Sequence, residues 1–310
     1  MKNRKFFIGV TTLIAILAII LLLMVTDWQP RRQASRPIRV VTSLNFYGET
    51  ARAVAGKYGH VTSIINGTAV DPHDYQPSSS QAEKVARANV VIVNGLGYDQ
   101  WLSQLVAGND EKQTVVNVAQ QVAGKKAGAN EHVWYRPSTM PQLADLLARR
   151  YAKLDPSHAH YYYRRARLYR HSLASLKHQI KRAHANAQRS SQKQVDVTEP
   201  VFDYALDHMG YQINDRHFAK AIEDGNDPSP ADIKNLRDDL RNHRVAFLVE
   251  NVQTSDRMIT NLVRLAKQEG VPVVKVSEAQ PANEDYVQWM SRQYRQLIKI
   301  QTEGNNHLNH

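Results

Sequence analysis

The chain contains no cysteine among its 310 residues. This absence excludes disulfide bonds, thiolate nucleophiles, cysteine-bound zinc, iron–sulfur clusters and a lipid-modified cysteine as a membrane anchor. The sequence also lacks the H-E-x-x-H pattern of metallopeptidases, the G-x-S-x-G pattern of serine hydrolases and a glycine loop that cradles phosphate. The usual marks of an enzyme are therefore missing, and we predict that the chain is not one.

A run of almost purely apolar residues occupies positions 6–25, close to the N-terminus. About 20 such residues are needed to cross a bilayer as a helix. The run lacks a small-residue cleavage pattern, and Trp28 suits a membrane interface. We predict that residues 1–28 form an N-terminal transmembrane helix, with a cleaved signal segment as the alternative. The remaining chain would then be extracellular and anchored at the cell membrane.

The formal net charge is +11, which suits nucleic acid, an anionic membrane surface or an anionic cell-wall polymer. Many of the basic residues lie on one predicted helix and are interleaved with tyrosines. They are Arg164, Arg165, Arg167, Arg170, Lys177, Lys181 and Arg182, among Tyr161, Tyr162, Tyr163 and Tyr169. Because no nucleic-acid-binding motif accompanies them, we interpret this pattern as a solvated helix face and predict no nucleic-acid partner.

After a polar spacer at residues 29–36, short apolar strand patterns alternate with helical patterns. Strands that alternate with helices predict an α/β protein with parallel, doubly wound sheets, in which ligands lie at the carboxyl ends of strands. The predicted strands are 38–41, 61–65, 90–93, 114–118, 195–197, 245–249 and 271–276.

A helical pattern over about 157–187 separates two stretches of this alternation. A helix of about 30 residues spans about 45 Å, which is too long for a crossover within one small domain. We therefore expect a strut between two lobes. The predicted segments are the anchor 1–28, the linker 29–36, the first lobe 37–156, the connecting helix 157–188, the second lobe 189–304 and a polar tail 305–310.

Four candidate metal donors follow strand patterns or lie in adjoining loops. His73 stands between Pro72 and Pro77, which restrict the loop that carries it. The other three donors are His132, Glu199 and Glu278. Two imidazoles and two carboxylates suit a divalent ion such as Mn²⁺ or Zn²⁺.

Several segments, in order and spacing, resemble the zinc- and manganese-binding solute-binding proteins of ABC transporters, a family of metal-binding lipoproteins and adhesins. The similar segments are residues 71–77, 91–102, 131–134, 198–204, 209–211, 247–250 and 276–278, within a region of about 38–300. The resemblance implies two α/β lobes joined by a rigid helix, with the metal ion in the cleft between them. It also implies a function, which is to capture a metal ion outside the membrane and pass it to an ABC-transporter permease.

By this resemblance, His73 and His132 match the two histidine ligands of the first lobe. Glu199 stands where zinc-binding members have histidine and manganese-binding members have glutamate, and Glu278 stands where an aspartate is usual. Residues 119–130 correspond to the histidine-rich loop of zinc-binding members but contain no histidine. The resemblance therefore favours Mn²⁺ over Zn²⁺ as the transported ion.

Three alternatives stay open at this point. One is a zinc-binding member of the same family. Another is a surface adhesin or interaction module that binds the metal only for stability. The third, less favoured, is a membrane-anchored metallohydrolase. Four protein donors would leave little room for the open coordination position of a hydrolytic metal, so we predict a binding protein, expected to be a monomer.

Overall fold

The structure is a computed structural model that describes residues 13–22, 37–109, 113–254 and 256–307. Contacts within the chain divide it into two units, residues 1–36 and residues 37–310. Residues 13–22 form a helix with exposed side chains, and the rest of the predicted membrane-spanning run lies outside the described residues. Within the described ranges, no helix has both the length and the apolar content that crossing a bilayer requires.

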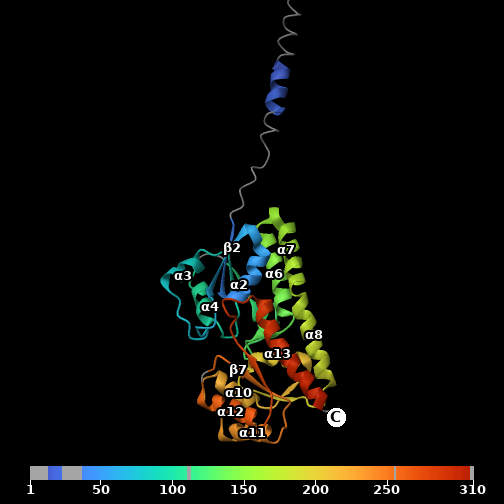
Figure 1. The fold of residues 1–310 in the computed structure, drawn as a ribbon. Coiled ribbons are helices and arrows are strands. Elements are labelled where there is room, and N and C mark those ends of the chain that lie inside the picture. Colours follow the sequence, from blue (N-terminus) through green and yellow to red (C-terminus); the bar gives the residue numbers. More distant parts are fainter. Residues whose placement is uncertain (1–12, 23–36, 110–112, 255, 308–310) are drawn as a thin grey trace, which may run out of the picture. The chain divides into compact units, whose positions relative to one another are not determined.

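The first lobe is built on a four-stranded parallel sheet in the order β2-β1-β3-β4. Figure 1 shows this lobe around the labels β2, α2, α3 and α4. Its strands are β1 (Ile38–Leu44), β2 (Gly59–Ile65), β3 (Val90–Val93) and β4 (Thr114–Asn117). Its helices are α2 (Asn45–Ala55), α3 (Ser79–Ala86), α4 (Gln100–Ala107), α5 (Val118–Gln121) and α6 (Thr139–Leu154), with 3-10 turns at Gly56–Tyr58, Val133–Tyr135 and Pro156–His158. All four residues of β3 are buried, as expected for a strand covered on both faces.

The connection between the lobes differs from the single helix predicted over 157–188. It consists of α7 (Ala159–Ser172) and α8 (Ala174–Arg189), which are separated at Leu173. In a continuous helix the amide of Leu173 would donate to the carbonyl of Tyr169. Here the Ser172 hydroxyl donates to that carbonyl at 2.7 Å, so a side chain takes the place of the backbone donor where the helix breaks.

The second lobe repeats the topology of the first, with a parallel sheet in the order β6-β5-β7-β8. Its strands are β5 (Gln194–Val197), β6 (Gln212–Ile213), β7 (Leu248–Asn251) and β8 (Val273–Val276). Its helices are α9 (Asp203–Met209), α10 (Arg216–Glu223), α11 (Pro230–Arg241), α12 (Arg257–Gln268) and α13 (Tyr286–His307), with a 3-10 turn at Pro200–Phe202. The predicted alternation of strands and helices is therefore confirmed in both lobes, although β6 and α10 were not predicted. Helix α13 also continues into the segment predicted as a polar tail.

One apolar core runs through both lobes. Trp289 of α13 is fully buried, and its ring lies 5.6 Å from that of Phe46 in α2. The Tyr135 hydroxyl donates to the carbonyl of Ser277 at 2.6 Å, and the Tyr286 hydroxyl donates to that of Trp134 at 2.7 Å. These buried contacts fix the ends of the first-lobe strands against the ends of the second-lobe strands.

Candidate metal centre

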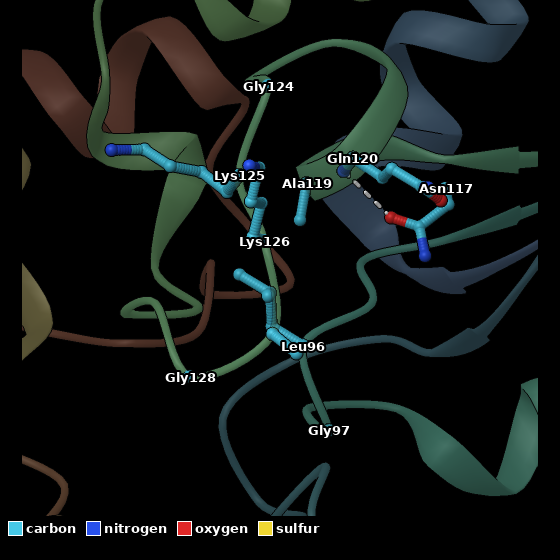
Figure 2. Close-up of a pocket in the computed structure, with 10 residues that line it drawn as sticks. Leu96, Gly97, Asn117, Ala119, Gln120, Gly124, Lys125, Lys126 and Gly128 are labelled. Atoms are coloured by element: carbon cyan, nitrogen blue, oxygen red, sulfur yellow. Dashed lines mark hydrogen bonds between the residues drawn. The ribbon is translucent and has the colours of Figure 1, made fainter.

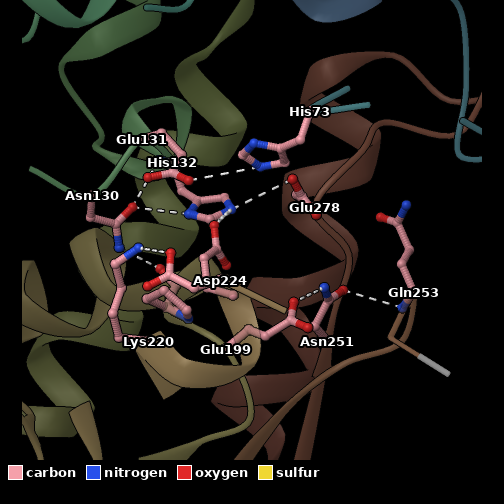
Figure 3. A network of polar contacts seen from close by, with 12 residues as sticks. His73, Asn130, Glu131, His132, Glu199, Lys220, Asp224, Asn251, Gln253 and Glu278 are labelled. Carbon is pink, nitrogen blue, oxygen red and sulfur yellow. Dashed lines mark hydrogen bonds and ion pairs between the residues drawn. The ribbon is translucent and has the colours of Figure 1, made fainter. Parts of the chain in front are cut away.

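The predicted donors lie where the carboxyl ends of the two sheets meet. A hollow of about 820 Å³ is lined there by His73, Glu131 and Glu223, together with residues of both lobes. A second hollow, of about 420 Å³, is lined by His73, Glu199 and Glu278. The structure therefore brings His73, Glu199 and Glu278 to one cleft. Figure 3 shows His132 beside His73, with a contact to Glu278.

The loop after β2 holds His73 by three contacts. The amide of His73 donates to Asp71 Oδ1 at 2.8 Å, which closes a local turn. The Trp101 indole donates to the carbonyl of Pro72 at 3.1 Å, and the Tyr98 ring meets the imidazole edge to face at 4.8 Å. His73 keeps an exposed side chain (36 %) and lies with Nε2 3.8 Å from Glu131 Oε1. It is thus the donor that an incoming ion can reach from solvent.

His132 is the opposite case, because its side chain is fully buried. Asn130 Oδ1 accepts from the backbone amide of His132 at 2.8 Å and lies 2.9 Å from Nδ1. An amide oxygen at Nδ1 favours the tautomer with the proton on that nitrogen, which leaves the Nε2 lone pair for a cation. Nε2 lies 3.7 Å from Glu223 Oε1 and 3.7 Å from Glu278 Oε1.

Glu199 follows β5 and is held within its own lobe. Asn251 Nδ2 donates to Glu199 Oε2, and the Thr254 hydroxyl donates to Glu199 Oε1 (Figure 3 shows the Asn251 contact). Each carboxylate oxygen can accept more than one hydrogen bond. These contacts therefore orient Glu199 and leave lone pairs that can bind an ion.

Two carboxylates that the sequence did not single out as donors also belong to the cleft. His73, Glu131 and Glu223 form the one group among the described residues whose ligand atoms all lie within 4.8 Å of one another. Glu131 precedes His132 in the first lobe. Glu223 ends α10, in the stretch that was left without a predicted element. The spacing of Phe218 and Ile222, one helical turn apart, was the signal for that helix.

The carboxylates make the cleft a place where positive charge is favoured. Burial by itself lowers the pKa of His132, but the carboxylates of Glu278, Glu223 and Glu131 raise it to about 9. Burial raises the pKa of Glu223 to about 9 against the opposing effect of His132, with Glu131 adding to the rise. Burial also raises the pKa of Glu199. In Glu278 the effect of burial is outweighed by His132, so its pKa is lowered.

A divalent cation fits this arrangement of donors. His132 Nε2, Glu223 Oε1 and Glu278 Oε1 are buried atoms without a hydrogen-bond partner in the part of the chain that the structure describes. Such atoms are costly unless something binds them. Their separations of 3.7 Å are too long for hydrogen bonds. Donors that each lie about 2.0–2.2 Å from a shared ion are, however, about 3–4 Å apart.

A neighbouring hollow of about 730 Å³ opens beside the cleft and shares Leu96, Gly97 and Gly128 with it (Figure 2). Its wall includes Lys125 and Lys126, from the loop that has no histidine. Lys125 Nζ lies 4.4 Å from the centre of the Tyr204 ring, which belongs to the second lobe. This loop therefore contributes a contact between the lobes and no additional metal donor.

Two parallel-sheet lobes with imidazole and carboxylate donors in the cleft between them define a metal-binding, solute-binding protein. Residues 40–300 match the family model described as zinc-uptake complex component A, periplasmic, and the chain belongs to this family. The resemblance noted from the sequence is thereby confirmed. A family of transport components also agrees with the prediction of a non-enzymatic protein.

Individual relatives are distant. The manganese-binding lipoprotein MntA of Halalkalibacterium halodurans is 26 % identical over 56 % of this chain, which spans only 58 % of that relative's length. MntA of Bacillus subtilis is 22 % identical over 77 % of this chain and 79 % of its own length. A manganese-bound point mutant of a periplasmic metal-binding protein from Candidatus Liberibacter asiaticus superposes with a TM-score of 0.71 at 16 % identity. That comparison covers 84 % of this chain and 98 % of the other, so it shows the shared fold.

Proposed function

We propose that the protein captures a divalent metal ion outside the membrane, with Mn²⁺ favoured over Zn²⁺, and delivers it to an ABC-transporter permease. The observation that carries this proposal is the set of buried, unpartnered donor atoms on His132, Glu223 and Glu278 in the cleft between the lobes. A family of solute-binding components supports the delivery step.

The ligands proposed from the sequence are His73, His132, Glu199 and Glu278. The distances support adding Glu223, whose Oε1 faces His132 Nε2, and Glu131, whose Oε1 faces His73 Nε2. Each added carboxylate brings negative charge and hard oxygen donors to the site. Oxygen-rich sets with several carboxylates suit Mn²⁺, which accepts more ligands than Zn²⁺ does. The names of the two MntA relatives also favour manganese.

The cell membrane is the proposed location, with the apolar run at residues 6–25 as the anchor and the metal-binding unit on the outer side. Reversible capture in a preformed cleft requires that the apoprotein stays folded. The large core shared by the lobes supports this requirement, because it holds the cleft together through contacts that do not involve the donors.

Thermal unfolding of the purified chain with added Mn²⁺ tests the proposal. At about 100 times the Kd, a ligand that binds only the folded state stabilises it by about 2.7 kcal/mol, which corresponds to a rise in Tm of about 5–10 °C. His132→Ala should abolish this rise, whereas the exposed surface variant His171→Ala should keep it. A chain that shows no metal-dependent rise, or that unfolds when chelator is added, contradicts the proposal.

Competition between Mn²⁺ and Zn²⁺, followed by elemental analysis of the protein, tests the choice of ion. Zinc binds such donor sets more tightly than manganese on intrinsic grounds, so the ions must be offered at buffered concentrations that reflect their availability. Preferred loading with Mn²⁺ under a buffered Mn²⁺ excess supports the proposal, and exclusive loading with zinc under the same conditions contradicts it. The variant Glu199→His should shift the balance toward zinc.

A further inference from the structure

Helices α7 and α8 carry the positive charge of the folded unit. Residues 159–189 contain eight Lys or Arg residues and no Asp or Glu, whereas the other residues of the 37–310 unit contain 26 basic and 28 acidic residues. Without these two helices the unit would have a formal net charge of −2. The charge is therefore a local feature of this helix pair, and not a property of the whole surface.

These basic side chains face solvent and are mostly without carboxylate partners. Tyr162, Ala166 and Tyr169 form the buried face of α7, and Leu176, Ile180, Ala183 and Ala187 form that of α8. Arg164, Arg167, Lys177, Lys181 and Arg182 are exposed. Of the eight basic residues, Arg170 is the one with an ion pair among the described residues, to Asp145 at 2.8 Å. A solvated face that only needed solubility would be expected to carry charges of both signs.

Exposed apolar side chains accompany the charges. Tyr163 is 42 % exposed and Leu168 is 52 % exposed, both on α7, and Leu154 at the end of α6 is 45 % exposed. They are three of the five large apolar residues in the 37–310 unit that are exposed among those the structure describes. A helix face that combines Lys and Arg with aromatic and aliphatic side chains is typical of binding to the surface of an anionic membrane.

The chain enters the folded unit next to this helix pair. Strand β1 begins at Ile38, which pairs in register with Gly59 of β2. Two residues before Gly59, the amide of Lys57 donates to the hydroxyl of Tyr161 on α7 at 3.2 Å. The point where the chain enters β1 therefore lies beside the start of α7.

We propose that the exposed face of α7 and α8, defined by Arg164, Arg167, Leu168, Lys177 and Arg182 with Tyr163, binds the anionic lipid surface of the membrane that holds the anchor. This inference rests in part on the proposed anchoring. The face lies on helices that the metal site does not use, so lipid binding and metal binding occupy separate parts of the molecule. Figure 1 shows α7 and α8 following one another along one side of the unit.

The absence of cysteine allows a direct test on the full chain. Leu168→Cys is labelled with a polarity-sensitive fluorophore, and Gln268→Cys, exposed on α12, is labelled as the control. Each labelled chain is mixed with vesicles of phosphatidylcholine, with or without about 30 mol % phosphatidylglycerol. We expect a blue shift at position 168 with the anionic vesicles only, and none at position 268. The shift should vanish at 1 M salt, where the Debye length falls from about 10 Å at 0.1 M to about 3 Å.

Charge reversal separates this face from general electrostatics. Arg164→Glu with Arg167→Glu should abolish the blue shift at position 168 with anionic vesicles, since each basic residue near such a surface contributes to its attraction. Arg264→Glu with Lys267→Glu on α12 changes the net charge equally and should leave the shift intact. An equal shift with uncharged vesicles, a shift that survives the α7 reversal, or no shift at all overturns the proposal.

Two further arms complete the test. A shift produced by soluble polyphosphate without vesicles, as large as that with anionic vesicles, would assign the face to an anionic polymer and overturn the membrane proposal. Flotation of the chain with vesicles at 1 M salt reports on the anchor alone. If the chain fails to float, the anchoring part of the proposed function fails, while the composition-dependent shift at position 168 still decides whether the helix face binds lipid.

Discussion

The two lobes share one sheet topology but supply different metal donors. The first lobe provides both histidines, His73 and His132, whereas the second lobe provides the carboxylates Glu199, Glu223 and Glu278. Glu131 is the exception on the first-lobe side. Imidazole nitrogens from one lobe and carboxylate oxygens from the other converge on one cleft, and this mixed donor set suits a divalent cation. This division of donors indicates that a single cation is bound by both lobes together.

The cores of the lobes differ as well. The first lobe packs entirely into the core that also contains α8, α9 and α13. The second lobe has in addition a small separate core under α10, α11 and α12, formed by residues such as Phe218, Leu236 and Leu240. The outer half of the second lobe, which carries Glu223, is thus supported more independently than the wall that carries the histidines.

A substitution in the core shared by both lobes should have a large effect on the free energy of unfolding. Trp289→Ala deletes a fully buried ring that packs against Phe46 and donates to Ser277 Oγ at 2.8 Å. We expect a loss of about 3–5 kcal/mol in the free energy of unfolding, measured in urea. Leu240→Ala in the separate core should cost about 2–5 kcal/mol and leave the environment of Trp134 unchanged. Equal perturbation of Trp134 by both variants would show that the cores are not distinct.

The histidines should differ in their effect on metal affinity. We expect His132→Ala to weaken Mn²⁺ binding by more than about 100-fold, beyond the range typical of groups that only orient a ligand. His73→Ala should weaken it less, because His73 is partly exposed and a water molecule can replace it. Isothermal titration of each variant checks this order. A larger loss for His73 than for His132 would reverse the assignment of inner and outer donors.

Glu223 and Asp224 form a matched pair on adjacent positions of the same hollow. Glu223→Gln should weaken Mn²⁺ binding by about 10–100-fold, as expected for a group that binds the ion or orients a ligand. Asp224→Asn removes the same charge, but Asp224 is paired with Lys220 at 2.5 Å, so we expect little change. Equal losses in the two variants would mean that Glu223 acts only through the overall charge of the cleft.

A pH dependence of stability is also expected in the second lobe. Burial and the neighbouring carboxylate of Asp239 raise the pKa of Asp196 to about 8, above its ordinary value of 3.8. The folded state then binds more protons than the unfolded state between these values, so this group lowers stability as the pH rises from about 4 to about 8. Asp196→Asn should therefore gain stability relative to the parent chain across that range, as measured by urea unfolding. A stability difference that stays constant with pH would contradict this expectation.

In the first lobe, Asp155 has the opposite effect on how the free energy of unfolding depends on pH. Burial by itself raises the pKa of Asp155, but hydrogen bonds from Ser157, Tyr162 and His158 outweigh it, so the pKa is lowered. This carboxylate adds stability above its ordinary pKa, and that stability is lost as the pH falls through the lowered value. Asp155→Asn should therefore be less stable than the parent chain at neutral pH and approach it in acid. Acid unfolding curves of the two proteins provide the measurement.

The alternation of strands and helices follows from the sequence alone, because the spacing of apolar residues reflects which backbone period can bury them. The sequence also indicated where helices end. Gly210 and Gly270 adopt φ values of 83° and 75°, which glycine reaches without strain, and they lie at the ends of α9 and α12. His73, Glu199 and Glu278 were found because each follows a strand-like run, and such positions meet at one edge of a parallel sheet.

The further donors that face the cleft became visible in the tertiary structure. Glu223 lies one short helix away from any strand end, and Glu131 gave no sign apart from its neighbour His132. Their approach to the imidazoles depends on how α10 and the 124–132 loop pack across the two lobes, and such packing is not encoded in local spacing. The break between α7 and α8 at Leu173 is likewise not encoded in local spacing, because the Ser172 hydroxyl donates to the Tyr169 carbonyl in place of a backbone amide. Local periodicity fixes which residues are buried, whereas contacts between distant segments fix which polar atoms meet.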